Sequence, residues 1–265
     1  MPQIHLNDIR VHVEDQGHGP PLVLVHGFPL DHTMWLGQIH GLADEFRVIA
    51  PDLRGFGRSD VTDGLVTMEQ FADDLAGMLD AMGIDQPVTL CGLSMGGYVG
   101  WQFWQRHADR LRALIQCDTR AVADPPDVAQ ARRENAERVL VEGTGFLVEG
   151  MMDKLFAPRS RTDLRDVVEA TRRVMLESSP AGVVAALLGM AARLDSTHIL
   201  TELDLPTLVV CGRHDVISTV EEMRTIAAAM PRAQFVEIED AGHMSPLEAP
   251  SPFNDAVRAF QRGPR

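Results

Sequence analysis

Short apolar runs recur along the chain and set its overall pattern. They span residues 22–25, 47–50, 88–91, 113–117, 207–211 and 234–238. Because most of their positions are apolar, a strand built from such a run would bury both of its faces. Strands of this kind are typical of a parallel sheet that helices cover on both sides. The runs therefore predict an α/β fold with a mostly parallel sheet.

The first residues follow a different pattern, in which apolar and polar positions alternate. Residues 3–6 and 9–14 show this alternation, and Asn7 and Asp8 stand between them. Alternation predicts strands with one buried face, and a polar pair between two such strands is typical of a hairpin turn. Together with the six apolar runs, the hairpin predicts a sheet of eight strands.

Segments with helical periodicity separate the predicted strands. Apolar residues recur on one face over residues 67–82, where Thr67 and Gln70 form a capping box at the start of the helix. Thr219 and Glu222 repeat this box before another helix. We expect these helices to flank the sheet on both faces.

Between residues 120 and 198 the alternation of strands and helices stops. This stretch holds no strand candidate, and its apolar residues recur at helical spacing. Residues 179–193 are apolar nearly all round, which predicts a helix buried on every side. We therefore expect an all-helical cap, residues 120–198, inserted into a core formed by residues 1–119 and 199–265.

Charge and composition limit the classes of partner. The chain has 265 residues and a formal net charge of -14, so it would repel nucleic acid and anionic membranes. No apolar run approaches the roughly 20 residues of a membrane-spanning helix, and the start lacks a secretory signal. Cys91, Cys117 and Cys211 lie in predicted buried strands, which favours reduced thiols over disulfides. We expect a cytoplasmic protein, with its oligomeric state left open.

The pentapeptide Gly92-Leu93-Ser94-Met95-Gly96 carries the strongest chemical signal. It lies between a predicted strand and a predicted helix, where Gly-x-Ser-x-Gly is typical of a nucleophile elbow. The tight turn strains the serine backbone, and the glycines let strand and helix approach each other. The serine hydroxyl then stands at a helix N-terminus, whose dipole favours developing negative charge. Ser94 is therefore the candidate nucleophile.

A serine nucleophile needs a base, and the base needs an acid that orients it. Asp215 and His243 each follow a later predicted strand, and the order Ser94, Asp215, His243 is that of the α/β-hydrolases. All three would project from the carboxyl ends of parallel strands, where open α/β sheets hold their sites. We predict that these three residues form a catalytic triad.

Three other residues compete for these roles. Asp118 also follows a predicted strand, so it is an alternative acid for the triad. His26 and His214 follow strands too and are alternative bases. His214 is best interpreted as a loop residue beside Asp215.

With these residues the chain resembles α/β-hydrolase fold proteins over nearly its whole length. It is most similar to the cap-bearing branch of carboxylesterases, 3-oxoadipate enol-lactonases and cofactor-free haloperoxidases or perhydrolases. The resemblance rests on the elbow and on residues 26–29, 51–59, 212–215 and 242–243. It implies that His26 supports a loop, and that the backbone N–H groups of Phe28 and Met95 form an oxyanion hole.

The predicted reaction is ester hydrolysis through an acyl-enzyme. Haloalkane dehalogenases and epoxide hydrolases resemble this chain, but they attack with a carboxylate where Ser94 stands here. No phosphate-binding or dinucleotide motif and no metal-ligand spacing is present, so we expect neither cofactor nor metal.

The predicted pocket is apolar and suits small to medium acyl groups. Its candidate residues come from the cap and from the loops around the triad: Trp35, Met151, Met152, Leu155, Phe156, Leu187, Leu188, Met190, Val216 and Met244. Methionine adapts to varied shapes, which favours a broad range of esters. The expected partner is therefore a small-molecule ester or lactone.

Other activities stay open on the same fold. An enol-lactonase would need a cation for its substrate's carboxylate, and the candidates in the cap are Lys154, Arg133, Arg172, Arg173 and Arg193. Perhydrolase or haloperoxidase activity would use the same acyl-enzyme. Remoter alternatives are a ligand-binding receptor and a hydroxynitrile lyase.

Overall fold

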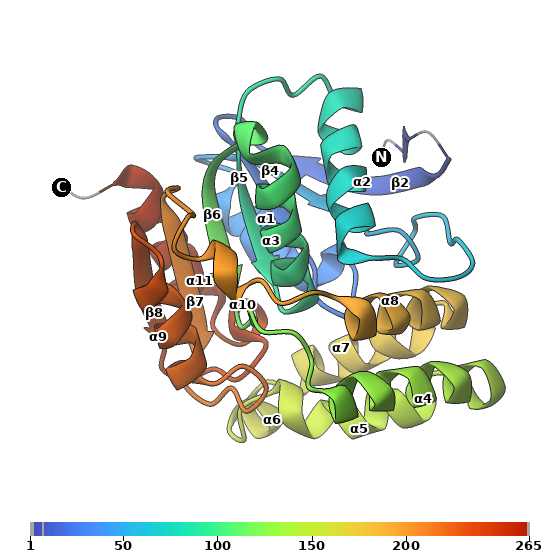
Figure 1. Ribbon diagram of the computed structural model, residues 1–265. Helices are drawn as coiled ribbons and strands as arrows, with labels where there is room; N and C mark the ends of the chain where they lie inside the picture. Colours follow the sequence, from blue (N-terminus) through green and yellow to red (C-terminus); the bar gives the residue numbers. More distant parts are fainter. Residues whose placement is uncertain (1–2, 7, 264–265) are drawn as a thin grey trace.

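A sheet with helices on both faces forms the centre of the molecule (Figure 1). The computed structural model describes residues 3–6 and 8–263. Within these residues the sheet has eight strands in the order β1-β2-β4-β3-β5-β6-β7-β8. The strands are β1 (Gln3–His5), β2 (Arg10–Gln16), β3 (Pro21–Val25), β4 (Arg47–Pro51), β5 (Val88–Leu93), β6 (Leu111–Cys117), β7 (Thr207–Gly212) and β8 (Ala233–Ile238).

Strand pairing confirms the predicted mix of directions. From β4 through β3 to β8, all neighbouring strands run parallel. The pairs β1–β2 and β2–β4 are antiparallel, and Ile4 lies opposite Val11 as the hairpin prediction requires. Asn7, in the predicted turn, lies outside the described residues.

Eleven α-helices and three short 3-10 helices lie within the described residues. Five of them come before β6 in the chain: η1 (His32–Trp35), α1 (Leu36–Leu42), α2 (Met68–Ala81), α3 (Met95–His107) and η2 (Ala108–Arg110). Between β6 and β7 come α4 (Pro126–Glu142), α5 (Gly145–Leu155), α6 (Ser160–Asp163), α7 (Arg165–Glu177), α8 (Pro180–Ala192) and η3 (Thr197–Ile199). The last are α9 (Val220–Ala229), α10 (Ser245–Glu248) and α11 (Pro250–Arg262).

At both helices the structure confirms the threonine half of the predicted capping box, while the side chains of Gln70 and Glu222 bond to Asp74 and Arg120. The Thr67 hydroxyl accepts a hydrogen bond from the Gln70 N–H at 3.1 Å, and the Thr219 hydroxyl accepts one from the Glu222 N–H at 3.3 Å. Each bond satisfies a backbone donor that the first turn of a helix leaves free.

The core divides into two layers because successive strand residues point to opposite faces. In β3, Leu22 and Leu24 pack with α1 and α11, whereas Val23 and Val25 pack with α2, α3 and α9. Burial on both faces explains why this strand is apolar at every position. Cys91, Cys117 and Cys211 are buried and free, as predicted.

Helices α4 to α8 gather beside one another below the sheet in the view of Figure 1. α8 is buried along most of its length and lies against core loops. A Cβ added to Gly182 would lie 1.9 Å from the Gly55 carbonyl oxygen, and the Val66 N–H donates to the Ala185 carbonyl at 3.3 Å. The close contact explains why a glycine stands in the first turn of α8.

No single helix among the described residues is long and apolar enough to cross a membrane. Helices α7 and α8 together pass that test by length and composition only, and they are bent by 94° at their junction.

Candidate active site

Ser94 stands on a strained turn between β5 and α3. Its φ of 53° and ψ of -111° lie outside the conformations that side-chain-bearing residues ordinarily adopt. A Cβ on Gly92 would lie 2.2 Å from the Gly96 carbonyl oxygen, so the turn cannot form with a larger residue there. Ser94 is partly exposed although Leu93 and Met95 are buried. The turn therefore presents the hydroxyl to an incoming molecule.

His243 and Asp215 form a buried pair beyond the ends of β8 and β7. The His243 Nδ1 lies 2.8 Å from the Asp215 Oδ2. The N–H groups of Ile217 and Ser218 donate to the other oxygen at 2.7 and 3.1 Å, and the Ser218 hydroxyl donates to Oδ2 at 2.8 Å. The carboxylate is thus fixed so that it holds the imidazole by Nδ1 and leaves Nε2 for chemistry.

The environment stabilises the charged forms of both members of this pair. Burial alone would lower the pKa of His243, but the charge of Asp215 and its hydrogen bond raise that pKa above its ordinary value. Burial would likewise raise the pKa of Asp215, but the charge of His243 and the donated hydrogen bonds lower it. A proton taken up by His243 is therefore stabilised by Asp215.

Asp118, the alternative acid, has other partners. Its Oδ1 accepts from the Gly212 N–H at 2.7 Å, and its Oδ2 accepts from the Ser245 hydroxyl. Burial raises its pKa well above the ordinary value, and the charge of Asp215 adds to the effect. Asp118 thus ties the end of β7 to the start of α10, while Asp215 holds the histidine.

The loop after β3 brings a second free amide beside the elbow. A Cβ on Gly27 would lie 3.5 Å from the Ser94 Cβ, so the backbone just before Phe28 touches the serine. Among the hydrogen bonds of the described residues, none uses the N–H of Phe28 or of Met95. Both amides are available to an oxyanion.

His26 supports this loop instead of acting as a base. Its ring nitrogens bond to the Gly27 carbonyl and to the Leu53 N–H, each at 2.9 Å. Burial lowers the pKa of His26, which keeps the ring neutral in this role. His214, the other alternative, is exposed.

Ser94 and His243 reach the same edge of the sheet, because β5, β6, β7 and β8 are parallel neighbours. Within the described part of the chain, no hydrogen bond joins the serine hydroxyl to the imidazole. Such bonds are often long before substrate binds, and rotation about χ1 changes the position of the hydroxyl.

In the structure the predicted pocket residues differ widely in how deeply they are buried. Met151, Met152 and Leu188 are half-buried, whereas Leu155, Phe156, Leu187 and Met190 are buried. Trp35 packs on Phe253 with ring centroids 6.1 Å apart, and neither Trp35 nor Met244 has exposed surface. Val216 is 66% exposed. Trp35 and Met244 therefore belong to the closed core and line no open space here.

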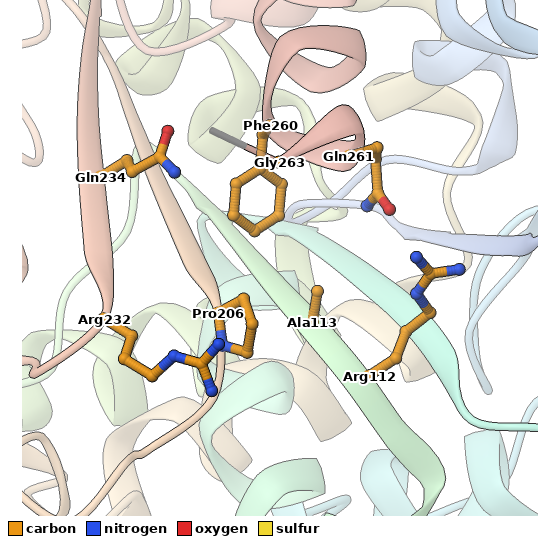
Figure 2. A pocket seen from close by; sticks show the side chains of 8 residues that line it. All are labelled: Arg112, Ala113, Pro206, Arg232, Gln234, Phe260, Gln261 and Gly263. Carbon is orange, nitrogen blue, oxygen red and sulfur yellow. The ribbon is translucent and has the colours of Figure 1, made fainter. Parts of the chain in front are cut away.

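Several hollows lie away from the triad, and two of them are close to regions discussed above. One, of about 350 Å³, is lined by Arg112, Arg232 and Phe260 among others (Figure 2) and lies at the amino ends of β6, β7 and β8, opposite the serine's edge. The other, of about 200 Å³, lies between η1 and α7, where Leu30 and Leu247 contribute to its lining. Neither is lined by Ser94.

The basic residues considered as partners for the carboxylate of a lactone substrate do not lie around one site. The Arg193 side chain is buried against Asp124 at 2.8 Å, and Arg172 pairs with Glu149. Lys154, Arg133 and Arg173 are exposed.

Comparison with known proteins places this chain in a family. The family model for the alpha/beta hydrolase fold matches residues 20–250. The structure of a thermophilic esterase from Thermogutta terrifontis superposes with a TM-score of 0.95 at 50% identity, over 96% of this chain and 93% of that one. The enol-lactonase from Burkholderia xenovorans LB400 superposes with a TM-score of 0.91 at 30% identity, over 98% and 100%.

A curated relative shows the same likeness along the sequence. The 3-oxoadipate enol-lactonase 1 of Acinetobacter baylyi is 26% identical over 252 residues, which cover 95% of this chain and 92% of the relative. The chain is a hydrolase and belongs to the α/β-hydrolase family.

Proposed function

We propose that the protein hydrolyses carboxylic esters of small to medium apolar acids, with Ser94, His243 and Asp215 as its catalytic triad. The observation that carries the proposal is the buried Asp215–His243 pair at the edge of the sheet where Ser94 stands on its strained turn. The pair supplies the oriented base that a serine nucleophile requires.

The proposed reaction has two steps. His243 takes the Ser94 proton through Nε2 while the serine oxygen attacks the ester carbonyl, and the alcohol leaves with that proton. A water molecule then gives its proton to His243 and attacks the acyl-enzyme, which releases the acid and restores Ser94. Asp215 stabilises the imidazolium in both steps.

The amides of Phe28 and Met95 form the proposed oxyanion hole. Support comes from their free N–H groups on the two segments that adjoin Ser94. Donors fixed in place before the reaction stabilise the negative charge of the tetrahedral intermediate without reorganisation.

We assign the role of a cap over this site to residues 120–198. The end of α5 lies against the loop that carries His243, since the Met244 N–H donates to the Leu155 carbonyl at 3.1 Å. Glu248 strengthens this contact by accepting from the N–H groups of Ala157 and Gly242, each at 2.8 Å. The half-buried Met151 and Met152 of the same helix are the proposed acyl contacts.

Esters are the preferred substrates in this account. The esterase from Thermogutta terrifontis is 50% identical, against 30% for the enol-lactonase from Burkholderia xenovorans LB400. The considered arginines and Lys154 do not place free positive charges around one site, which also argues against a lactone substrate that carries a carboxylate. Enol-lactonase activity is the second candidate, favoured by the relatives of that name.

A substrate panel with a nucleophile variant tests the proposal. We expect hydrolysis of p-nitrophenyl acetate and butyrate, with kcat/KM at least about tenfold higher for butyrate than for a muconate-derived enol-lactone. Ser94→Ala should lose about 10⁴-fold or more in kcat while its circular dichroism stays unchanged. Near-wild-type turnover by this variant would overturn the triad, and a preference for the lactone would favour the second candidate.

A further inference from the structure

A cluster of metal-binding side chains lies under η1, away from the triad. His12 and Glu14 are on one face of β2, and His32 in η1 covers them. All three residues are more than nine-tenths buried. One ring nitrogen of each histidine and one carboxylate oxygen of Glu14 lie within 4.8 Å of one another.

His12 has an unsatisfied polar atom in this cluster. Its Nε2 is buried and has no hydrogen-bond partner, and its ring centroid lies 4.9 Å from that of His32. A buried polar atom without a partner costs free energy, so native proteins rarely retain one without a use. A bound cation would satisfy an imidazole nitrogen here.

His32 is oriented as a metal ligand would be. Its Nδ1 lies 2.7 Å from the Asp52 Oδ1, so in the neutral ring the Nδ1–H donates to the carboxylate and Nε2 keeps its lone pair. Burial would lower the pKa of His32, but the hydrogen bond and the charge of Asp52 raise it, so the ion would have to displace an Nε2 proton. Asp52 is itself fixed by the N–H groups of His32 and Arg58, at 2.8 and 2.9 Å. A carboxylate behind a ligating histidine is the usual outer shell of a metal site, because it sets the tautomer and the ring orientation.

The charges also suit a divalent ion. Glu14 and Asp52 together supply two negative charges, against the one positive charge of Arg58, which disfavours the protonated forms of both His12 and His32. The Glu14 Oε1 accepts from the Gln16 side chain at 2.9 Å, which leaves Oε2 for a ligand. Two imidazoles and one carboxylate, with a fourth position for water, are a set that zinc adopts in proteins.

We propose that His12, Glu14 and His32 bind a divalent transition-metal ion, with zinc preferred. The ligand spacing is too irregular in sequence to indicate the site, since β2 and η1 come together only in the fold. Strands β4 and β3 separate β2 from β5, so the ion would not be bound by the residues that carry out ester hydrolysis. Its effect is to fasten η1 and the loop after β4 to strand β2.

Zinc titration of the untagged chain, first freed of metal with a chelator, tests this proposal. Calorimetry should show one zinc ion bound per chain, and cobalt in its place should give the visible absorption of a low-coordinate site. Glu14→Gln and His12→Phe should each weaken zinc binding by more than about tenfold, whereas His40→Gln, which removes an exposed imidazole on α1, should not.

Thermal unfolding gives a second readout that does not depend on activity. A zinc concentration 100 times the dissociation constant should raise the Tm of the wild-type chain by about 5 °C. The same addition should raise the Tm of Glu14→Gln by at most about half as much, because that zinc concentration is at most about ten times the dissociation constant of a site at least tenfold weaker. The proposal is overturned if the wild-type chain binds no stoichiometric zinc, or if Glu14→Gln binds it as tightly as the wild type; in either case the cluster only packs η1 onto the sheet.

Discussion

At the carboxyl ends of β6 and β7, two buried aspartates have pKa shifts in opposite directions. Burial and the charge of Asp215 raise the pKa of Asp118, so its neutral form is favoured. Asp215 is buried too, but His243 and its donated hydrogen bonds lower its pKa, so its charged form is favoured. Asp215, which is hydrogen-bonded to His243, is therefore better suited than Asp118 to stabilise an imidazolium.

Asparagine substitutions at the two positions separate their roles. Asp215→Asn should lower kcat by roughly 10⁴-fold, because it removes the charge and disturbs the tautomer of His243. Asp118→Asn should keep kcat within about tenfold, because an amide resembles the neutral acid that burial favours. Steady-state kinetics with p-nitrophenyl butyrate measures both. A larger loss for Asp118→Asn would transfer the acid's role to Asp118.

The pH profile of kcat/KM reports on the same pair. Asp215 raises the pKa of His243, and the base works only when it is neutral, so activity should fall as pH drops through that raised value. In Asp215→Asn the remaining activity should persist to lower pH, because the charge that raises the pKa is gone. If kcat/KM of the variant falls at the same low pH as that of the wild type, a group other than His243 controls the fall.

Among single residues, the sequence could identify those whose role depends on their neighbours in the chain. Ser94 is recognisable because its strain and its glycines lie within five residues. Asp215 is preferred to Asp118 in the sequence only through the resemblance of residues 212–215 to the family, since both aspartates follow strands, and the bond to His243 adds support for it that no local pattern could give. His12, Glu14 and His32 form no sequence motif because they meet through strand β2 and a distant turn.

Among the elements, α8 attaches the helical segment to the core at the loop after β4. Its amino-terminal turn passes so close to the loop after β4 that Gly182 faces the Gly55 carbonyl without room for a methyl group. The sequence predicts a helix buried on all sides here, which is confirmed. It does not reveal which loop the helix contacts, because that contact joins residues more than a hundred positions apart.

Two glycine substitutions test how the helical segment is attached. Gly182→Ala should reduce the free energy of unfolding by about 1–3 kcal/mol, since its Cβ would overlap the Gly55 carbonyl. Gly150→Ala in α5 meets no atom within 4 Å and should be neutral or stabilising by up to about 1 kcal/mol. Denaturant unfolding compares the two. Equal stabilities would show that α8 moves freely away from Gly55.

Over the whole molecule, the pattern of apolar runs predicts how many strands form but not how they are ordered. β3 is flanked by β4 and β5, and β2 joins β4 from the other side, an order set by packing between distant segments. The pocket is the least predictable part. Trp35 is apolar and near the oxyanion loop in sequence, yet it packs onto Phe253 of α11.

The central claim is that Ser94 forms a covalent intermediate, and a stoichiometric active-site label tests it most directly. A fluorophosphonate should add one group per chain, on the peptide that carries Ser94, and esterase activity should fall in proportion to labelling as followed by mass spectrometry. Ser94→Ala should not react at this peptide. Labelling confined to another residue, or full activity in a chain already labelled on Ser94, would contradict the account.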